Sequence, residues 1–269
     1  MDIVDADAET LEKSITLAKQ KILDLAIRSK LVPQDPTDEP ASELLKKIKA
    51  EKEALVKAGK IKKDKHDSYI FKGDDNCYYE QLNGKTVDIT DEVPFDLPDT
   101  WEWCRLRSLG YIVGGGTPST TNPSYWGGSI PWLSPADLTG YSQKYIAHGK
   151  KNITEAGLEK SSAVIMPAGS VLYSSRAPIG YVVISENPIS TNQGFKSLVP
   201  VVSGMSEFYY YALKARTYDI KQRAIGTTFK EISGHDFGDT LVPLPPLKEQ
   251  KYIVQTIEQY NAILEAILK

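Results

Sequence analysis

Residues 11–25 have the sequence LEKSITLAKQKILDL, in which apolar residues recur at alternating steps of four and three. This spacing puts one apolar stripe along a helix and is typical of a coiled-coil seam. It predicts a helix over residues 9–30, ending before Pro33, because a proline disfavours helical backbone in the residue preceding it. An amphipathic helix on a core is the alternative. The stripe consists of Leu11, Ile15, Ala18, Ile22 and Leu25.

The same spacing returns at the end of the chain. The proline-rich segment 243–246 precedes a second heptad-like helix, predicted over residues 247–268. Its stripe consists of Ile253, Ile257, Tyr260, Leu264 and Ile267. We expect the two stripes to pair, because isolated helices of this length are marginally stable in water. Two copies of the chain could instead exchange these helices and form a two-fold dimer.

The segment after the first helix is rich in charge. Good helix formers predict a helix over residues 42–58, with Gly59 as its left-handed stop. A basic run follows, formed by Lys60, Lys62, Lys63 and Lys65. Such runs are usually solvated, and contact with phosphates is the alternative. Residues 61–100 are polar, contain Pro94 and Pro98, and are predicted to be a linker.

Residues 101–245 have a different composition, in which Gly, Pro, Ser and Thr clusters alternate with short β-branched or aromatic runs. The runs predict strands at 163–165, 170–174, 180–185 and 195–202, followed by a helix over 205–223. We therefore expect an α+β fold, with one globular domain built on a curved, mostly antiparallel sheet and with coiled-coil-like terminal helices.

Charge and composition exclude several classes of protein. Residues 1–99 carry 16 Lys and Arg against 22 Asp and Glu, whereas residues 100–245 carry 13 against 10, so the middle segment is basic within an acidic chain. Two cysteines exclude a disulfide framework, and three histidines without i,i+4 spacing to one another indicate no metal site. No apolar run could span a membrane. The acidic start is unlike a signal peptide, so we expect a cytoplasmic protein.

Catalytic motifs are incomplete. Asn122-Pro123-Ser124-Tyr125 resembles the motif with which amino-methyltransferases hold a target base. The glycines at 114–116, however, lead into a loop and not into the helix that a cofactor site needs. Glu249-Gln250-Lys251 matches half of a nuclease metal site, but it lies on a helix. We therefore expect no catalysis and no cofactor. A stand-alone adenine methyltransferase using Asn122–Tyr125 and a protein-interaction module without DNA binding remain alternatives.

The basic middle segment contains side chains that bind DNA in other proteins. Arginine, lysine and glutamine contact base edges or phosphates, and serine hydroxyls contact phosphates. The candidates for DNA binding are Ser119, Arg176, Gln193, Lys196, Arg223 and Lys230.

Seven segments, taken in order, resemble one known family, the specificity subunits of type I restriction-modification systems. They are ILDLAIRSKLVPQDP (22–36), DEPASELL (38–45), LPDTWEW (97–103), GGTPS (115–119), IPWLSPADL (130–138), STNQGF (190–195) and VPLPPLKEQ (242–250). The resemblance divides the chain into a conserved helical region (1–60), a linker (61–100), a target-recognition domain (101–245) and the start of a conserved coiled-coil helix (246–269).

The resemblance implies a function without chemistry of its own. In this family each target-recognition domain reads one half of a split site in double-stranded DNA. The conserved helices set the distance between halves and dock methyltransferase (modification) subunits, and restriction subunits complete the endonuclease. A complete subunit has two recognition domains, whereas this sequence has one, so we expect a half-subunit or a fragment.

Overall fold

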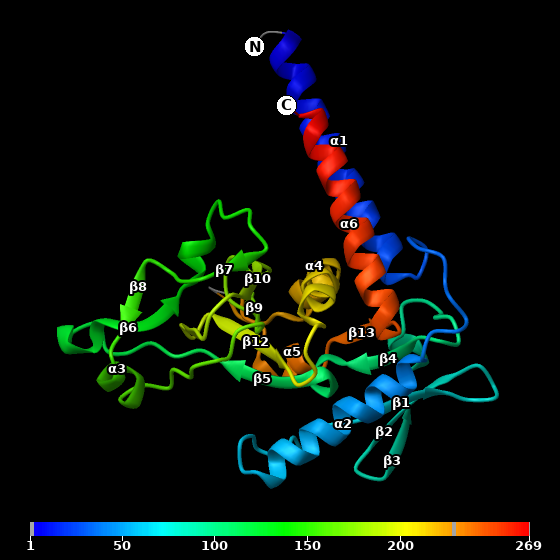
Figure 1. Cartoon of the computed structure of the whole chain (residues 1–269), viewed down its shortest axis with the longest axis horizontal. Coiled ribbons are helices and arrows are strands. Elements are labelled where there is room, and N and C mark those ends of the chain that lie inside the picture. Colours follow the sequence, from blue (N-terminus) through cyan, green and yellow to red (C-terminus); the bar gives the residue numbers. More distant parts are fainter. Residues whose placement is uncertain (1–2, 228–229, 269) are drawn as a thin grey trace.

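The computed structural model describes residues 3–227 and 230–268. The outer ends of the predicted domain ranges, at residues 1 and 269, lie outside the described residues. Two long helices, α1 (Ile3–Ile27) and α6 (Leu247–Ile267), form an arm that projects from a mixed α/β body (Figure 1). No helix among the described residues is long and apolar enough to cross a membrane.

The body contains four small sheets. The largest has five strands in the order β5-β12-β9-β10-β7, and the next is β11-β6-β8. A two-stranded ribbon pairs β13 with β4, and a three-stranded meander joins β1, β2 and β3. Their bounds are β1 Tyr69–Lys72, β2 Tyr78–Leu82, β3 Lys85–Asp88, β4 Glu102–Arg105, β5 Gly110–Gly114, β6 Trp126–Leu133, β7 Tyr145–Ile146, β8 Lys151–Ile153, β9 Val171–Ser174, β10 Val182–Ser185, β11 Ser190–Thr191, β12 Phe195–Pro200 and β13 Leu241–Leu244.

The predicted α+β class and the predominance of antiparallel pairing are confirmed. Only β10 with β7 and β11 with β6 pair in parallel among the described strands. The pairing is divided among several sheets and not gathered in the single sheet expected. The remaining helices are α2 (Ala41–Lys57), α3 (Glu155–Glu159), α4 (Ser206–Arg223) and α5 (Gly234–Gly238), with short 3₁₀ turns η1 (Thr90–Glu92), η2 (Leu106–Leu109), η3 (Pro123–Tyr125) and η4 (Pro135–Leu138).

Two expectations were wrong. Residues 163–165 are not a strand; pairing begins only at Met166, which forms an isolated bridge to Ile189. Ser190 and Thr191, which an extended ladder would need, pair instead with β6, and Thr191 O accepts from Gly116 N. The segment 61–100, expected to be a linker, contains β1–β3. Asn83 and Gly84, both with positive φ, form the tight turn between β2 and β3.

The main core joins the arm to the body. It unites Ala26 of α1, Leu44 and Ile48 of α2, Ile253 and Ile257 of α6, and the aromatic run of α4. The first helical region therefore shares its core with the predicted recognition domain. At the same junction Lys144 binds both Glu207 of α4 and Glu258 of α6, which fastens the loop before β7 to both helices.

Beyond this junction α1 and α6 run side by side in opposite directions (Figure 1). Lys19 Nζ lies 2.8 Å from Glu265 Oε1 across the pair, and Ile15 is buried. The predicted stripe residues differ in exposure along the arm. Ile253 and Ile257 are buried in the main core, Ile22, Leu25 and Leu264 are half-buried, and Leu11, Tyr260 and Ile267 are exposed. α1 ends at Ile27 because Ser29 adopts positive φ and Lys30 N donates to Leu25 O.

A buried hydrogen bond joins the residue before β4 to the first turn of α6. Trp101 Nε1 donates to Glu249 Oε2 at 2.9 Å. Glu249 is only 4% exposed, and its Oε1 is buried with no hydrogen-bond partner among the described residues. Burial raises the pKa of Glu249 above its ordinary value, although the Trp101 hydrogen bond opposes the shift. This residue, noted above as part of an incomplete nuclease motif, is therefore part of the core.

We expect Glu249→Gln to raise the free energy of unfolding at pH 7 by about 1 kcal/mol, since it keeps the acceptor for Trp101 and removes a buried charge. A carboxyl whose pKa is raised by folding costs stability as pH rises above its unfolded value. The gain should therefore vanish below pH about 4.5. Urea unfolding from pH 4 to 8 measures this; equal unfolding free energies of wild type and variant at pH 7 would contradict it.

Candidate nucleic-acid interface

Two glycines bring together the loops that hold Ser119 and Gln193. A Cβ on Gly115 would lie 1.8 Å from Asn192 O, and one on Gly116 would lie 2.2 Å from Ala163 N, so no other residue fits without a shift. Gly116 N donates to Thr191 O at 2.8 Å, and Gly116 O accepts from Trp132 Nε1 at 2.9 Å. The loop after β5 is thus fixed against the loop between β11 and β12.

Gln193 lies at this junction. Its side-chain oxygen accepts a hydrogen bond from the Thr117 hydroxyl, while the side chain remains exposed. The neighbouring Asn192 uses its own side-chain oxygen to accept from Gly194 N at 2.9 Å, which shapes the turn. Ser119 is exposed two residues beyond Thr117 and pairs with the Thr121 hydroxyl at 2.8 Å. The junction therefore presents amide and hydroxyl groups to solvent.

Two of the predicted cations share one carboxylate. Arg176 Nη2 lies 2.6 Å from Glu231 Oε2, and Lys196 Nζ lies 3.2 Å from Glu231 Oε1. Burial tends to raise the pKa of Glu231, but the hydrogen bonds from both cations outweigh it and hold that pKa below its ordinary value. Glu231 also pairs through its backbone with Arg176 and Ile225, so Glu231 is tied both to the segment after β9 and to the segment after α4.

The cluster therefore keeps an excess of positive charge. Two cations face one carboxylate, and the exposed Lys230 adjoins Glu231 in sequence. Lys196 Nζ also lies 3.4 Å from Gln193 O, which links the cations to the loop between β11 and β12. The structure thus brings Arg176, Gln193, Lys196 and Lys230 together, with Ser119 on the adjoining loop. Glu231 and Thr117, which organise the cluster, were missed because their partners are distant in sequence.

Arg223 lies apart from this cluster. Its guanidinium donates to Asp236 O at 2.5 Å and to Thr240 Oγ1 at 2.7 Å, so it joins the end of α4 to α5. These contacts occupy the side chain within the fold, and contact with DNA remains a prediction for this residue.

The residues that resemble a methyltransferase motif form a local turn. Asn122 Oδ1 accepts from Ser124 N at 3.1 Å and from Ser124 Oγ at 2.7 Å, which caps η3. Tyr125 O accepts from Thr154 N at 3.0 Å. The Asn122 oxygen that would hold a target amine is thus bonded to Ser124.

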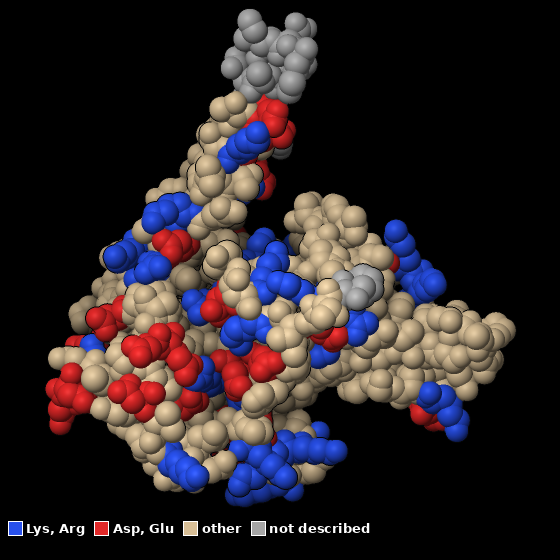
Figure 2. Space-filling model, turned by 180° about the vertical axis from the view of Figure 1, so that it is seen from behind, with Lys and Arg blue, Asp and Glu red and all other residues tan. Residues whose placement is uncertain are grey.

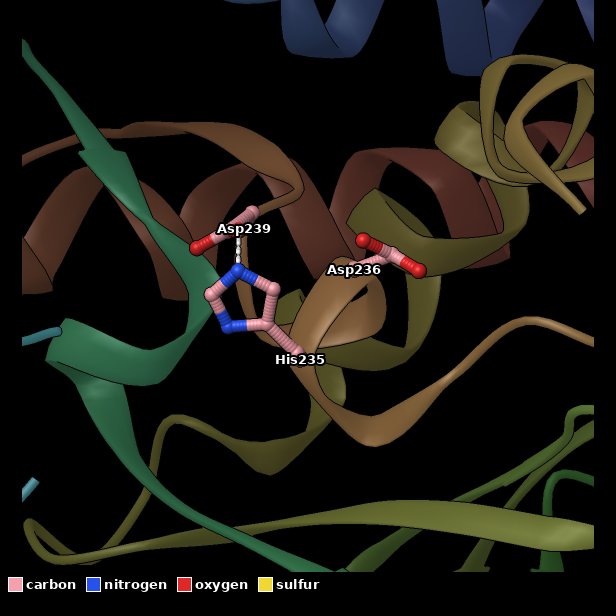
Figure 3. A group of neighbouring side chains, drawn as sticks. All are labelled: His235, Asp236 and Asp239. Atoms are coloured by element: carbon pink, nitrogen blue, oxygen red, sulfur yellow. Dashed lines mark ion pairs between the residues drawn. The ribbon is translucent and has the colours of Figure 1, made fainter.

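His235, Asp236 and Asp239 form a group of potential metal ligands on α5 and its end, and it was not anticipated from the histidine spacing (Figure 3). His235 Nε2 lies 3.1 Å from Asp239 Oδ2. Asp239 also binds the buried Arg107 at 2.6 Å, and Asp236 accepts from Ser233 Oγ at 2.7 Å. An imidazole nitrogen and carboxylate oxygens suit a divalent cation, but here Arg107 already neutralises the carboxylate of Asp239.

Comparison with known proteins places this geometry in context. Residues 98–269 match the family model described as type I restriction modification DNA specificity domain. The MjaIX specificity subunit of Methanocaldococcus jannaschii is 39% identical over 171 residues, which are 63% of this chain and 40% of that protein. The EcoAI specificity subunit of Escherichia coli is 41% identical over 143 residues, 53% of this chain and 20% of that protein.

Solved structures show the same fold at lower identity. The HsdS subunit from Thermoanaerobacter tengcongensis matches with a TM-score of 0.50 and 20% identity, over 96% of this chain and 51% of that one. A chain from a study of complex assembly and conformational transition in the type I R-M system matches with a TM-score of 0.52 and 19% identity, over 98% and 52%. This chain thus spans about half the length of these structures, and less of the curated relatives above.

We expect Arg223→Gln to lower the free energy of unfolding by about 1–3 kcal/mol, because the part-buried acceptors on Asp236 and Thr240 are then left without a charged donor. Lys230→Gln is the control, since Lys230 is exposed. Thermal unfolding of both variants measures this. If the two variants melt at the same temperature as wild type, the guanidinium contacts do not stabilise the fold.

Proposed function

The chain belongs to the family of type I restriction-modification DNA specificity domains, and from that premise we propose that it is a specificity subunit, or one half of such a subunit. It binds double-stranded DNA and recognises one half of a split site. It performs no chemistry itself and acts by docking methyltransferase subunits, with restriction subunits joining in the full complex. Because its proposed ligand is DNA and its proposed partners act on DNA, we also propose a cytoplasmic location.

The observation that supports DNA binding best is the cluster around Glu231. Arg176, Lys196 and Lys230 supply more positive charge than Glu231 neutralises, which favours phosphate. Gln193 is exposed beside them and can make paired hydrogen bonds to an adenine edge. Cations for the backbone and an amide for a base therefore meet at one place, and Gly115 fixes the loop after β5 against the loop that holds the amide.

The alternatives differ in what they would bind. A methyltransferase built on Asn122–Tyr125 requires S-adenosylmethionine, and Asn122 here caps a turn. A protein-interaction module would lack salt-dependent binding to DNA. Binding assays with each ligand separate the three functions.

We expect Lys230→Gln to weaken binding to all duplexes alike and to lower the slope of log affinity against log salt by about 1, since it removes one phosphate contact. Gln193→Ala should cost about 1–3 kcal/mol on the recognised site and nothing on unrelated duplexes. That site can be found by methylome sequencing of cells with and without the gene, and fluorescence anisotropy at several salt concentrations then measures both effects.

Glu231→Gln provides a control of opposite sign. It frees Arg176 and Lys196 from their carboxylate, so binding to DNA should strengthen and its salt slope should steepen. If changing Arg176, Gln193, Lys196 and Lys230 together leaves affinity for DNA unaltered, the DNA face lies elsewhere.

We also propose that the arm can bind a second copy. Its exposed apolar residues are Leu11, Leu17, Tyr260, Ile263, Ile267 and Leu268. The relatives described above are longer, and this chain matches 40% of the MjaIX subunit and 51% of the HsdS subunit. Two copies packed through this face would place two identical recognition domains on one complex, and such a dimer would recognise a palindromic split site.

We expect wild type to have twice the chain mass of 29.8 kDa in light scattering, and Ile263→Asp to give a folded monomer. Ile263 is 59% exposed within one chain, so an aspartate there disturbs only a contact between copies. Ile257→Asp is unsuitable, because Ile257 belongs to the main core. Gln255→Asp, an exposed change on the same helix, is the control. A monomeric wild type, or a dimer that tolerates Ile263→Asp, would refute this proposal.

A further inference from the structure

The most basic segment of the chain lies outside the proposed recognition face. Residues 41–65 contain nine lysines and four acidic residues, a net charge of +5 in a chain of net charge −3. This exceeds the net +3 of residues 100–245. The segment consists of α2 and the loop that follows it.

Most of these lysines have no acidic partner. Within the described ranges, Lys46 and Lys47 pair with Glu43 and Glu39, and Lys52 is buried against Asp67. The other lysines make no ion pair to any described residue; they are Lys49, Lys57, Lys60, Lys62, Lys63 and Lys65, and all are exposed. Figure 2 shows Lys and Arg gathered at the foot of the molecule, where α2 ends in Figure 1.

The acidic residues nearest to these lysines form ion pairs with buried cations instead. Gly59 has φ +68° and lets the chain reverse, so that Lys60–Lys65 return beside the end of α2. Asp64 binds the buried Arg107 at 3.2 Å, and Asp67 binds the buried Lys52 at 2.7 Å. Both aspartates therefore anchor the loop to the body. Because they are already paired, they do not neutralise the exposed lysines of this loop.

The lysines border a groove between α2 and the β1–β3 sheet. The groove has a volume of about 730 Å³, and Lys46, Lys49, Lys57, Lys62 and Lys63 are among its lining residues. From residue 57 to 65 the chain contains no Arg, Gln or Asn. Lysine is a hydrated point charge on a flexible stem, which suits phosphate contact and not base recognition.

From this we infer that the lysine surface of α2 and residues 57–65 binds the phosphate backbone of the DNA duplex outside the half-site. The inference rests on the proposed DNA-binding function. It assigns non-specific affinity to the helical region and recognition to the loops around Glu231.

The test is a full chain with Lys57, Lys60, Lys62 and Lys63 changed to Gln. Its control changes four exposed lysines of the arm and its surroundings, Lys13, Lys21, Lys30 and Lys251, to Gln. We expect the first variant to lower the salt slope by about 1 for each phosphate that it no longer neutralises, hence by about 2–4. Affinity for recognised and unrelated duplexes should fall by the same factor. The control should retain the wild-type slope.

Duplex length supplies a second readout. Trimming the duplex to the half-site should remove the difference between wild type and the first variant, because the flanking phosphates are then absent. An unchanged salt slope on long duplexes, while wild type binds them, overturns the inference and leaves the proposed function standing. A variant that binds DNA normally but no longer binds a methyltransferase subunit also overturns the inference, because the lysine surface is then a protein-binding surface. Failure of wild type to bind any duplex instead removes the proposed function.

Discussion

The hydrogen bond between Trp101 and Glu249 is the contact on which the layout depends. Trp101 stands just before β4, and Glu249 stands in the first turn of α6, just after β13. Since β4 and β13 pair along their whole length, the start of β4 lies beside the end of β13 and the start of α6. α6 begins at this point, and its Ile253 and Ile257 lie in the same core cluster as Ala26 of α1. Burying the carboxyl of Glu249 lowers the stability of the fold, but its hydrogen bond with Trp101 fixes the junction from which the arm extends.

Charge in this protein is arranged by a few buried or bridging groups. Glu231 holds Arg176 and Lys196 together near Gln193. Asp64 and Asp67 form ion pairs with Arg107 and Lys52, so the exposed lysines beside them have no acidic partner among the described residues. An overall charge of −3 therefore conceals two basic surfaces of different character. One combines cations with an amide, and the other contains lysine almost exclusively.

The four long helices, α1, α2, α4 and α6, were predicted to within a few residues, apart from the start of α1, whereas the five-residue helices α3 and α5 were not predicted. Strands of the β-rich middle were predictable where runs such as 195–200 are buried, and not at 163–165, where the residues that would be their partners pair with β6. The β1–β3 sheet was missed although Asn83-Gly84 is a strong hairpin signal. Gln193, Arg176 and Lys196 were identified by type alone. Their grouping around Glu231 depends on contacts between residues 35 to 55 apart, which no local pattern contains.

The antiparallel arm has a consequence for how the gene could be rearranged. Its first and last described turns lie near one end of the same two-helix rod (Figure 1). A short peptide could therefore close the chain into a ring, and new ends could be opened in a surface loop without altering the core. By the same geometry, a tandem duplication would let the last helix of one repeat run directly into the first helix of the next. The rod would become a continuous shaft with a globular unit at each end, and its length, counted in helical turns, would fix the distance between the two units.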